Sequence, residues 1–293
     1  MRYKKSLGEN TFDVCNYLFL LALLFITLYP VWYVVMASFS DELALYTSKG
    51  LLFWPKGFSI ESYKLVFDYE RLWIGYRNTI FYVAVGGTIS VLLTLITAYC
   101  LTRPGLPGKN IFMMGILIPM YFGGRMISCF LVVKSVHMLD TVWAMLLPGA
   151  ISSYNLILTI NYFRGMPREL EEAAKIDGAS EWKILFKVLI PLAKPIIAVI
   201  TLYYCVGKWN TYMDALIYLR DQDLQPLQMV LRQILVQNDT AAATGGSASS
   251  DTAAFSEGVK YATVVVSTLP IMCVYPFIQK YFVKGVMIGA VKG

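Results

Sequence analysis

The sequence contains one histidine, His137, and only five cysteines among its 293 residues. A single histidine almost excludes His-based metal sites and catalytic triads, which draw on several side chains. The cysteines show no metal-ligand spacing, and all lie in apolar segments: Cys15, Cys100, Cys129, Cys205 and Cys273. Cysteines in such segments behave as small buried hydrophobes, so we expect neither a disulfide framework nor a metal site.

Charge is also scarce. Charged residues make up 15% of the chain and hydrophobic residues 57%, and the mean hydropathy is +0.57. Soluble domains are roughly 45–50% apolar, so the composition indicates an integral membrane protein. The formal net charge of +6 fits the excess of Lys and Arg that membrane proteins carry on their cytoplasmic side, and we do not interpret it as nucleic-acid binding.

A third absence is the phosphate-binding loop. No stretch matches G-x-x-x-x-G-K-[ST], whose backbone N–H groups cradle phosphates. The chain is therefore not predicted to be an enzyme or to hydrolyse ATP. If ATP drives its function, another subunit must bind and hydrolyse it.

Long uncharged runs dominate what is present. A helix needs about 20 apolar residues to cross the hydrocarbon core, and six segments qualify. We therefore predict an all-α membrane protein of one domain, residues 1–293, with six transmembrane helices at about 14–38, 78–101, 110–133, 141–163, 194–219 and 261–282. The first run is longer than the apolar core of a signal peptide, so we expect an uncleaved span. Residues 220–260 are predicted to form a polar external loop.

Basic residues set the predicted orientation. Arg2, Lys4 and Lys5 place the N-terminus in the cytoplasm. Six spans then place the C-terminus, the basic turn at Arg103 and the charged segment 166–191 on the same side. The prediction is a multi-pass protein of the cytoplasmic (inner) membrane with both termini inside.

The charged segment predicts two short amphipathic helices joined by a tight turn. Pro167 suits a first helical turn, and the glutamates that follow favour a helix N-terminus. Gly178 can adopt the left-handed conformation that ends a helix, and Ser180 can cap the next one. The second helix is predicted to carry its apolar side chains on one face: Trp182, Leu185, Phe186 and Leu189. A pair that only lies on the membrane surface is the alternative.

This segment resembles the EAA loop of ABC importer permeases. The resemblance lies in Glu172-Ala173-Ala174, then Gly178, then Val188-Leu189-Ile190-Pro191, where Val188 and Ile190 replace the usual Ile and Leu. The longer stretch GMPRELEEAAKIDGAS is similar to the carbohydrate-uptake, binding-protein-dependent branch. Residues 141–151 and 255–260 look most like permeases for polysaccharide-derived sugars, which include alginate-type importers.

The resemblance implies a type I importer permease whose helix pair is a cytoplasmic coupling element. Two homologous permeases would pair, each docking on one of two ATP-binding subunits that hold ATP and Mg, and an extracytoplasmic solute-binding protein would deliver the sugar. By position, the coupling residues would be Glu171, Glu172, Ala173, Ala174, Asp177 and Gly178. The tail 281–293 would reach the ATP-binding subunits, or would be an ordinary membrane-flanking tail.

Two cations lie in or near predicted spans, where charge is costly and tends to face a cavity or a partner. Lys208, with Trp209, Asn210 and Tyr212, could line a sugar pathway. Alternatively, Lys208 snorkels or pairs with another helix. Arg125 could line the pathway or mark the outer end of its span. Cations in the pathway would favour an acidic, uronate-type sugar such as alginate.

The sequence thus predicts the permease subunit of an ATP-driven importer of oligo- or polysaccharides. An ion-driven secondary transporter without an ATPase subunit is the alternative. That class favours paired acidic residues inside spans and broken-helix repeats, whereas Asp214 is the only carboxylate well within a predicted span. A membrane scaffold would leave the helix pair unexplained. The external loop could contact the binding protein or serve as a solvated connector.

Overall fold

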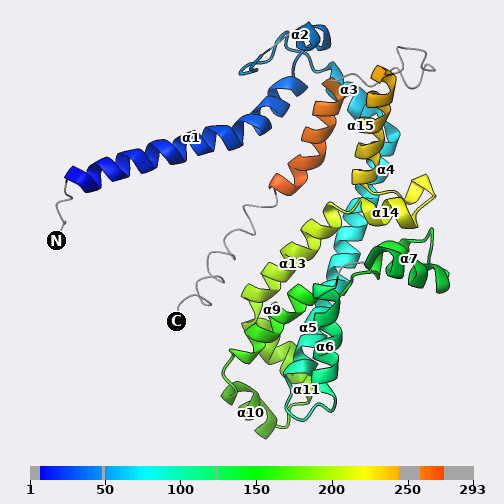
Figure 1. Ribbon diagram of the computed structural model, residues 1–293. Coiled ribbons are helices and arrows are strands. Elements are labelled where there is room, and N and C mark those ends of the chain that lie inside the picture. Colours follow the sequence, from blue (N-terminus) through cyan, green and yellow to red (C-terminus); the bar gives the residue numbers. More distant parts are fainter. Residues whose placement is uncertain (1–6, 48–49, 123–124, 244–257, 274–293) are drawn as a thin grey trace. The chain divides into compact units, whose positions relative to one another are not determined.

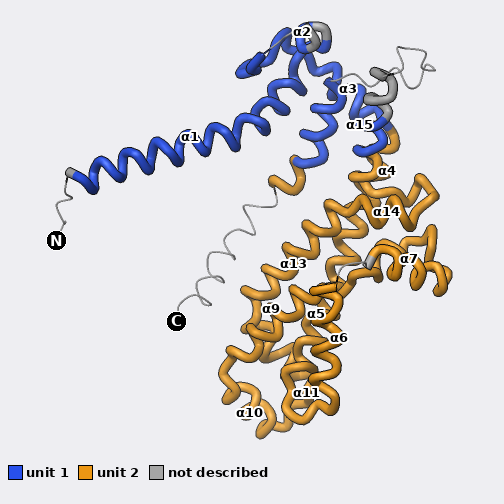
Figure 2. Tube along the Cα trace, in the orientation of Figure 1, with its two compact units in different colours: residues 1–69, 231–268 blue, residues 70–230, 269–293 orange. Residues whose placement is uncertain are grey.

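The computed structural model describes residues 7–47, 50–122, 125–243 and 258–273. Within these ranges the chain is helical (Figure 1), with one isolated antiparallel bridge between Ser40 and Phe58 and no strand. The predicted all-helical class is therefore confirmed for the described residues. The chain divides into two compact units, residues 1–69 with 231–268 and residues 70–230 with 269–293 (Figure 2).

The first unit contains α1 (Leu7–Ser38), α2 (Glu42–Thr47) and α3 (Glu61–Asp68). Ala37, Leu45 and Leu52 form a small buried cluster where the end of α1 meets the segment after it. The Trp32 indole donates a hydrogen bond of 3.0 Å to the carbonyl of Phe53, which ties that segment to α1.

The second unit is built around one continuous helix of 33 residues, Glu70–Thr102. It comprises α4 (Glu70–Phe81), a π-helical turn η1 (Tyr82–Gly86) and α5 (Gly87–Thr102). Two helices, α9 (Ser153–Arg164) and α13 (Lys194–Trp209), pack against α5, and α6 (Lys109–Tyr121) packs against α9 (Figure 1). The core that these helices share with residues 184–189 is mainly apolar, and its almost fully buried side chains include Ala98, Leu156, Ile160, Ile184, Leu185 and Ile200.

Two helices, Gly8–Ser38 and Glu70–Thr102, are long and apolar enough to cross a membrane in the described part of the chain. A third is added if Glu181–Leu192 and Lys194–Trp209, bent by 86° to one another, count as one span. The structure therefore does not confirm six spans. It agrees with the first two predicted spans and extends them to Leu7 and Glu70 at their N-terminal ends.

Three other predicted spans are interrupted. Span 110–133 is divided into α6 and α7 (Arg125–Ser135), span 141–163 into α8 (Val142–Leu146) and α9, and span 194–219 into α13 and α14 (Met213–Tyr218). The second break contains Pro148, which lacks a backbone donor, and Gly149, whose φ is +70°. Hydropathy alone does not register such breaks.

The prediction of a loop over 220–260 is wrong in its first half. η3 (Gln222–Leu224) and the helix α15 (Leu227–Ala243) occupy this region. Leu227, Val230, Leu231 and Ile234 recur at helical spacing and are buried, which explains the helix. The last predicted span begins as a helix, Gly258–Cys273. Residues 244–257, 274–282 and the tail 281–293 lie outside the described residues.

Candidate functional site

The charged segment forms a helix hairpin, as predicted. Its first helix, α10 (Glu169–Ile176), has three acidic residues in its first turn, where the helix dipole favours negative charge. It ends at Gly178, whose φ is +73°. The N–H of Gly178 bonds to the carbonyl of Lys175 at 3.0 Å, and the N–H of Ala179 bonds to that of Ala174 at 2.9 Å. This pair of bonds is the Schellman arrangement, which satisfies the last carbonyls of the helix.

The second helix differs from the prediction. It consists of α11 (Glu181–Lys183), a π-helical segment η2 (Ile184–Leu189) and α12 (Ile190–Leu192). Ser180 occupies the N-cap position, but its side chain makes no capping bond. The single apolar face predicted for this helix is divided: Leu185 and Leu189 are buried, whereas Trp182 and Phe186 are exposed and stack on each other at 6.0 Å. The wider π turn changes the register between the two pairs.

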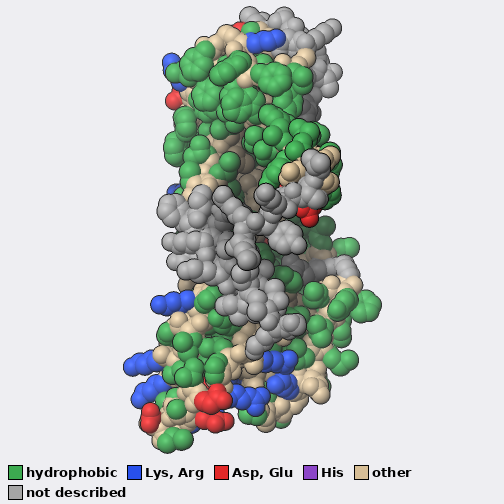
Figure 3. Space-filling model, turned by 90° about the vertical axis from the view of Figure 1, so that its left-hand side faces the viewer, with side chains coloured by type: hydrophobic (Ala, Val, Ile, Leu, Met, Phe, Trp, Pro, Cys, Tyr) green, Lys and Arg blue, Asp and Glu red, His purple; other side chains and the backbone are tan. Residues whose placement is uncertain are grey.

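The predicted coupling residues separate into an outer and an inner group. Glu172, Ala173, Asp177 and Gly178 are exposed on the hairpin. Ala174 packs against the core, and Glu171 points towards α5. Ile176, for which the sequence predicted no role, is 86% exposed beside Asp177. In the view of Figure 3, acidic side chains gather at the end where the hairpin lies, with lysine and arginine side chains next to them.

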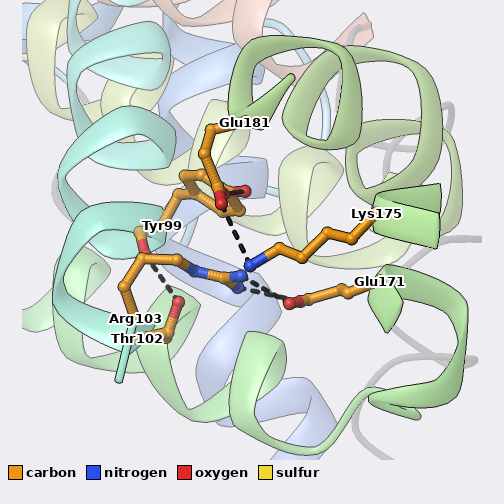
Figure 4. Close-up of polar contacts among 6 residues, drawn as sticks. All are labelled: Tyr99, Thr102, Arg103, Glu171, Lys175 and Glu181. Carbon is orange, nitrogen blue, oxygen red and sulfur yellow. Dashed lines mark hydrogen bonds and ion pairs between the residues drawn. The ribbon is translucent and has the colours of Figure 1, made fainter. Parts of the chain in front are cut away.

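Five side chains join the hairpin to the end of α5 (Figure 4). The Arg103 guanidinium binds the Glu171 carboxylate through two N–H groups, one at 2.8 Å. It also lies 4.1 Å above the ring of Tyr99. The Tyr99 hydroxyl donates a hydrogen bond to Glu181, which pairs with Lys175 at 3.0 Å. We call these residues, Tyr99, Arg103, Glu171, Lys175 and Glu181, the hairpin clamp.

The electrostatics of the clamp favour its charged state. The bond to Glu171 raises the pKa of the Arg103 guanidinium above its usual value. Hydrogen bonds from Tyr99 and Lys175 hold the pKa of the Glu181 carboxyl below its usual range. From the sequence alone, Glu171 was expected to contact an external partner, and Arg103 was placed only in a basic turn. Sixty-eight positions separate the two residues, and no local pattern links them.

Lys208 has partners within the chain. Its ammonium donates to the carbonyls of Met145 at 3.2 Å and Leu146 at 3.5 Å, at the C-terminal end of α8. Its stem crosses Gly86 in η1, where an added Cβ would lie 2.7 Å from the lysine Cε. This geometry corresponds to the alternative in which Lys208 pairs with another helix, since carbonyls at a helix end attract cations.

The other predicted pathway residues lie near the end of α13. The Trp209 ring meets Tyr76 of α4 edge to face at 6.3 Å, and within the described chain its buried indole N–H has no hydrogen-bond partner. The Asn210 amide donates to the carbonyl of Val206 at 3.0 Å, and Tyr212 is half-buried before α14. Arg125 begins α7, and the placement of its side chain lies outside the described part.

Known proteins resemble this chain over nearly its whole length. The family described as "Binding-protein-dependent transport system inner membrane component" matches residues 90–288. Protein LplC of Bacillus subtilis (strain 168) is 43% identical over 284 residues, covering 97% of this chain and 96% of that protein. The polygalacturonan/rhamnogalacturonan transport system permease protein YtcP of the same organism is 39% identical over 290 residues, with 97% and 99% covered.

A solved structure has the same fold. It is described as a bacterial ABC transporter involved in the import of the acidic polysaccharide alginate. Its matching chain is 33% identical to this one, with a TM-score of 0.84 over 96% of this chain and 99% of that chain.

Proposed function

The chain belongs to the inner membrane components of binding-protein-dependent transport systems, which are ABC transporter permeases, and from this premise we propose that it is the translocation subunit of an ATP-driven importer of oligo- or polysaccharides. It crosses the cytoplasmic membrane six times with both termini inside. It works with a second homologous permease, two ATP-binding subunits that hold ATP and Mg, and an extracytoplasmic solute-binding protein. The chain itself needs no cofactor.

The outer face of the hairpin carries this proposal. Ile176 is 86% exposed at the tip of a polar helix, and such an apolar side chain beside charged ones suits burial against another protein. Ala173 and Gly178 are small and exposed there, so a partner backbone can approach closely. Glu172 and Asp177 offer carboxylates to a cation on that partner. We propose that this outer face docks on an ATP-binding subunit, with Glu171 and Ala174 supporting it from the inner side.

ATPase measurements on the co-expressed complex in proteoliposomes test the proposal. The loaded binding protein should stimulate ATP hydrolysis by the parent complex and should fail to stimulate it in Glu172→Lys. Glu169→Lys is the matched control, because Glu169 is an exposed carboxylate in the same helical turn but lies outside the motif. Equal effects of the two variants would count against docking through Glu172. Transport without any ATPase subunit would instead favour an ion-driven transporter.

We further propose that the sugar is acidic and contains uronate units. The support comes from the relatives, one named for polygalacturonan and rhamnogalacturonan transport and one described with the acidic polysaccharide alginate. Lys208 supports it less, since backbone carbonyls occupy its ammonium. The proposed pathway residues remain Trp209, Asn210, Tyr212 and Arg125. Aromatic faces and amides suit sugars, and a cation such as Arg125 suits an acidic one.

The sugar class can be tested by comparing uronate oligosaccharides with neutral ones of equal length. Stimulation of ATPase activity and uptake should be stronger with the uronates at equal concentration. Stronger stimulation by the neutral sugars would contradict an acidic substrate and leave the importer assignment intact. Trp209→Ala should weaken uptake of either class, because ring stacking does not depend on the carboxylate.

A further inference from the structure

The hairpin clamp joins the proposed docking element to a helix that crosses the membrane. Arg103 directly follows α5, and Glu171 lies on α10. The helix that ends beside Arg103, Glu70–Thr102, has 33 residues. At 1.5 Å per residue it is roughly 50 Å long, enough to cross the hydrocarbon core. The clamp therefore lies at one end of a membrane-crossing helix.

The geometry of this ion pair differs from that of an ordinary surface pair. Exposed pairs held by a single bond contribute little to stability. Here two parallel N–H···O bonds fix the orientation of both groups. The side chains are only 19% and 17% exposed, and the guanidinium also stacks on the Tyr99 ring. Removal of either partner would leave the other charge poorly solvated.

The clamp also holds both helices of the hairpin. Glu171 and Lys175 lie on α10, whereas Glu181 begins α11. Tyr99 is buried in the core between α5 and its neighbours and donates its hydroxyl proton in a hydrogen bond to Glu181. The end of α5 thus contacts the hairpin on each side of the Gly178 turn. The hairpin cannot tilt away from α5 without breaking at least one of these charged contacts.

We propose that Arg103 is a positioning residue for energy coupling, which locks the hairpin to α5 so that the two move as one rigid body. This inference depends on the proposed docking of the hairpin on an ATP-binding subunit. A displacement that such a subunit imposes on α10 is then transmitted to the helix Glu70–Thr102, because the ion pair resists loosening between them. Glu171 and Tyr99 act through the same contacts.

The test uses the full complex, with assembly measured as subunit stoichiometry after purification. Arg103→Glu places a second carboxylate against that of Glu171 and should unlock the hairpin by repulsion. We expect the complex to assemble with its basal ATPase activity, and the ratio of stimulated to basal activity to fall about tenfold, within the range of allosteric couplings. Sugar uptake should fall by the same factor.

Two further variants make the result specific. The exchange Arg103→Glu with Glu171→Arg restores opposite charges and should recover most of the stimulation. Arg164→Glu is the matched control, since it reverses an exposed arginine at the end of α9 and should preserve the stimulation ratio. If Arg103→Glu does not assemble, Arg103→Gln and Glu171→Gln remove one charge each without introducing repulsion, and each should lower the same ratio.

The outcomes separate the inference from the proposed function. If the parent complex shows no stimulation and transports without an ATPase subunit, the proposed function fails. If the parent is stimulated and Arg103→Glu, or the neutral variants in its place, keep the parent ratio, the inference is wrong. It is also wrong if basal and stimulated activity fall equally, because the ion pair would then serve stability alone. Failure of the charge exchange to restore stimulation would likewise overturn it.

Discussion

Gly86 and Gly87 are neighbours in one helix, yet a methyl group added at each would meet different surroundings. Both have helical backbone angles, with φ of −67° and −62°, so alanine is compatible with either backbone. An added Cβ at Gly86 would lie 2.7 Å from Cε and 2.9 Å from Nζ of Lys208. At Gly87, among the residues that the structure describes, it would meet only the Cys205 sulfur, at 3.6 Å. We predict that alanine destabilises the fold at Gly86 and is neutral or stabilising at Gly87.

The magnitudes follow from two contributions. Alanine is better than glycine in a helix by about 0.8–1.0 kcal/mol, and this gain applies to both positions. At Gly86 the lysine must also move and give up its bonds to the carbonyls of Met145 and Leu146. Hydrogen bonds from a charged donor contribute about 1.5–3 kcal/mol. Gly86→Ala should therefore destabilise the fold by about 1–2 kcal/mol, whereas Gly87→Ala should be neutral or stabilise it by up to about 1 kcal/mol.

Reversible denaturant unfolding in mixed micelles measures both free energies. The decisive comparison is a double-mutant cycle with Lys208→Ala, which removes the side chain that the new methyl group would displace. Gly86→Ala should lose its destabilising effect in that background. An unchanged cost there, or an equal cost for Gly87→Ala, would show that the packing of Lys208 across Gly86 does not control stability.

Three further predictions concern the turns. Gly178→Ala should lower the free energy of unfolding by about 1–2 kcal/mol, because residue 178 has a left-handed backbone. Steric contact adds nothing to this cost, since an added Cβ meets no atom of the described residues within 4 Å. Unchanged amide exchange at the hairpin turn would contradict this. Asn78→Asp sets a carboxylate against two carbonyls of the 223–225 turn, at 2.7 and 3.0 Å. It should make that turn sensitive to proteolysis, in contrast to the parent. Hydrogen bonds from the backbone N–H groups of Asp221 and Arg220 hold the pKa of the Asp140 carboxyl below its usual value. The stability that these bonds give the fold is therefore complete above the unfolded pKa of about 4, and it is lost as pH falls through the folded pKa. Asp140→Asn should remove this acid step from the unfolding midpoint.

The hairpin could be predicted because its signals are local. Gly178 lies at a position whose backbone has positive φ, and the acidic first turn precedes it by a few residues. The helix and its turn are therefore set by neighbours in sequence. The division of the second helix into buried Leu185 and exposed Trp182 was not predicted, because a π-helical turn has no comparable sequence signal.

Non-local features could not be predicted. The packing of α5 against α9 brings Arg103 and Glu171 together across 68 positions of the sequence. No local sequence pattern predicts such a pair. For Lys208 the sequence left two alternatives open, a pathway cation or a partner of another helix, and only the packed structure places its ammonium at the carbonyls of Met145 and Leu146. The interrupted spans were missed for a related reason, since average hydropathy counts apolar side chains and ignores the direction of the backbone.

The π-helical turn η1 lets the helix Glu70–Thr102 tolerate a change of chain length at one place. Such a turn accommodates one residue more than an α-helical turn does. Deleting one residue between 82 and 86 would allow a regular α-helix to form there, and the side chains of α5 would keep the faces that they present now. Within α5 itself, the same deletion would rotate every side chain beyond it by about 100°. In an evolutionary comparison, a one-residue gap at 82–86 is thus compatible with unchanged packing of this helix, whereas a gap further along it is not.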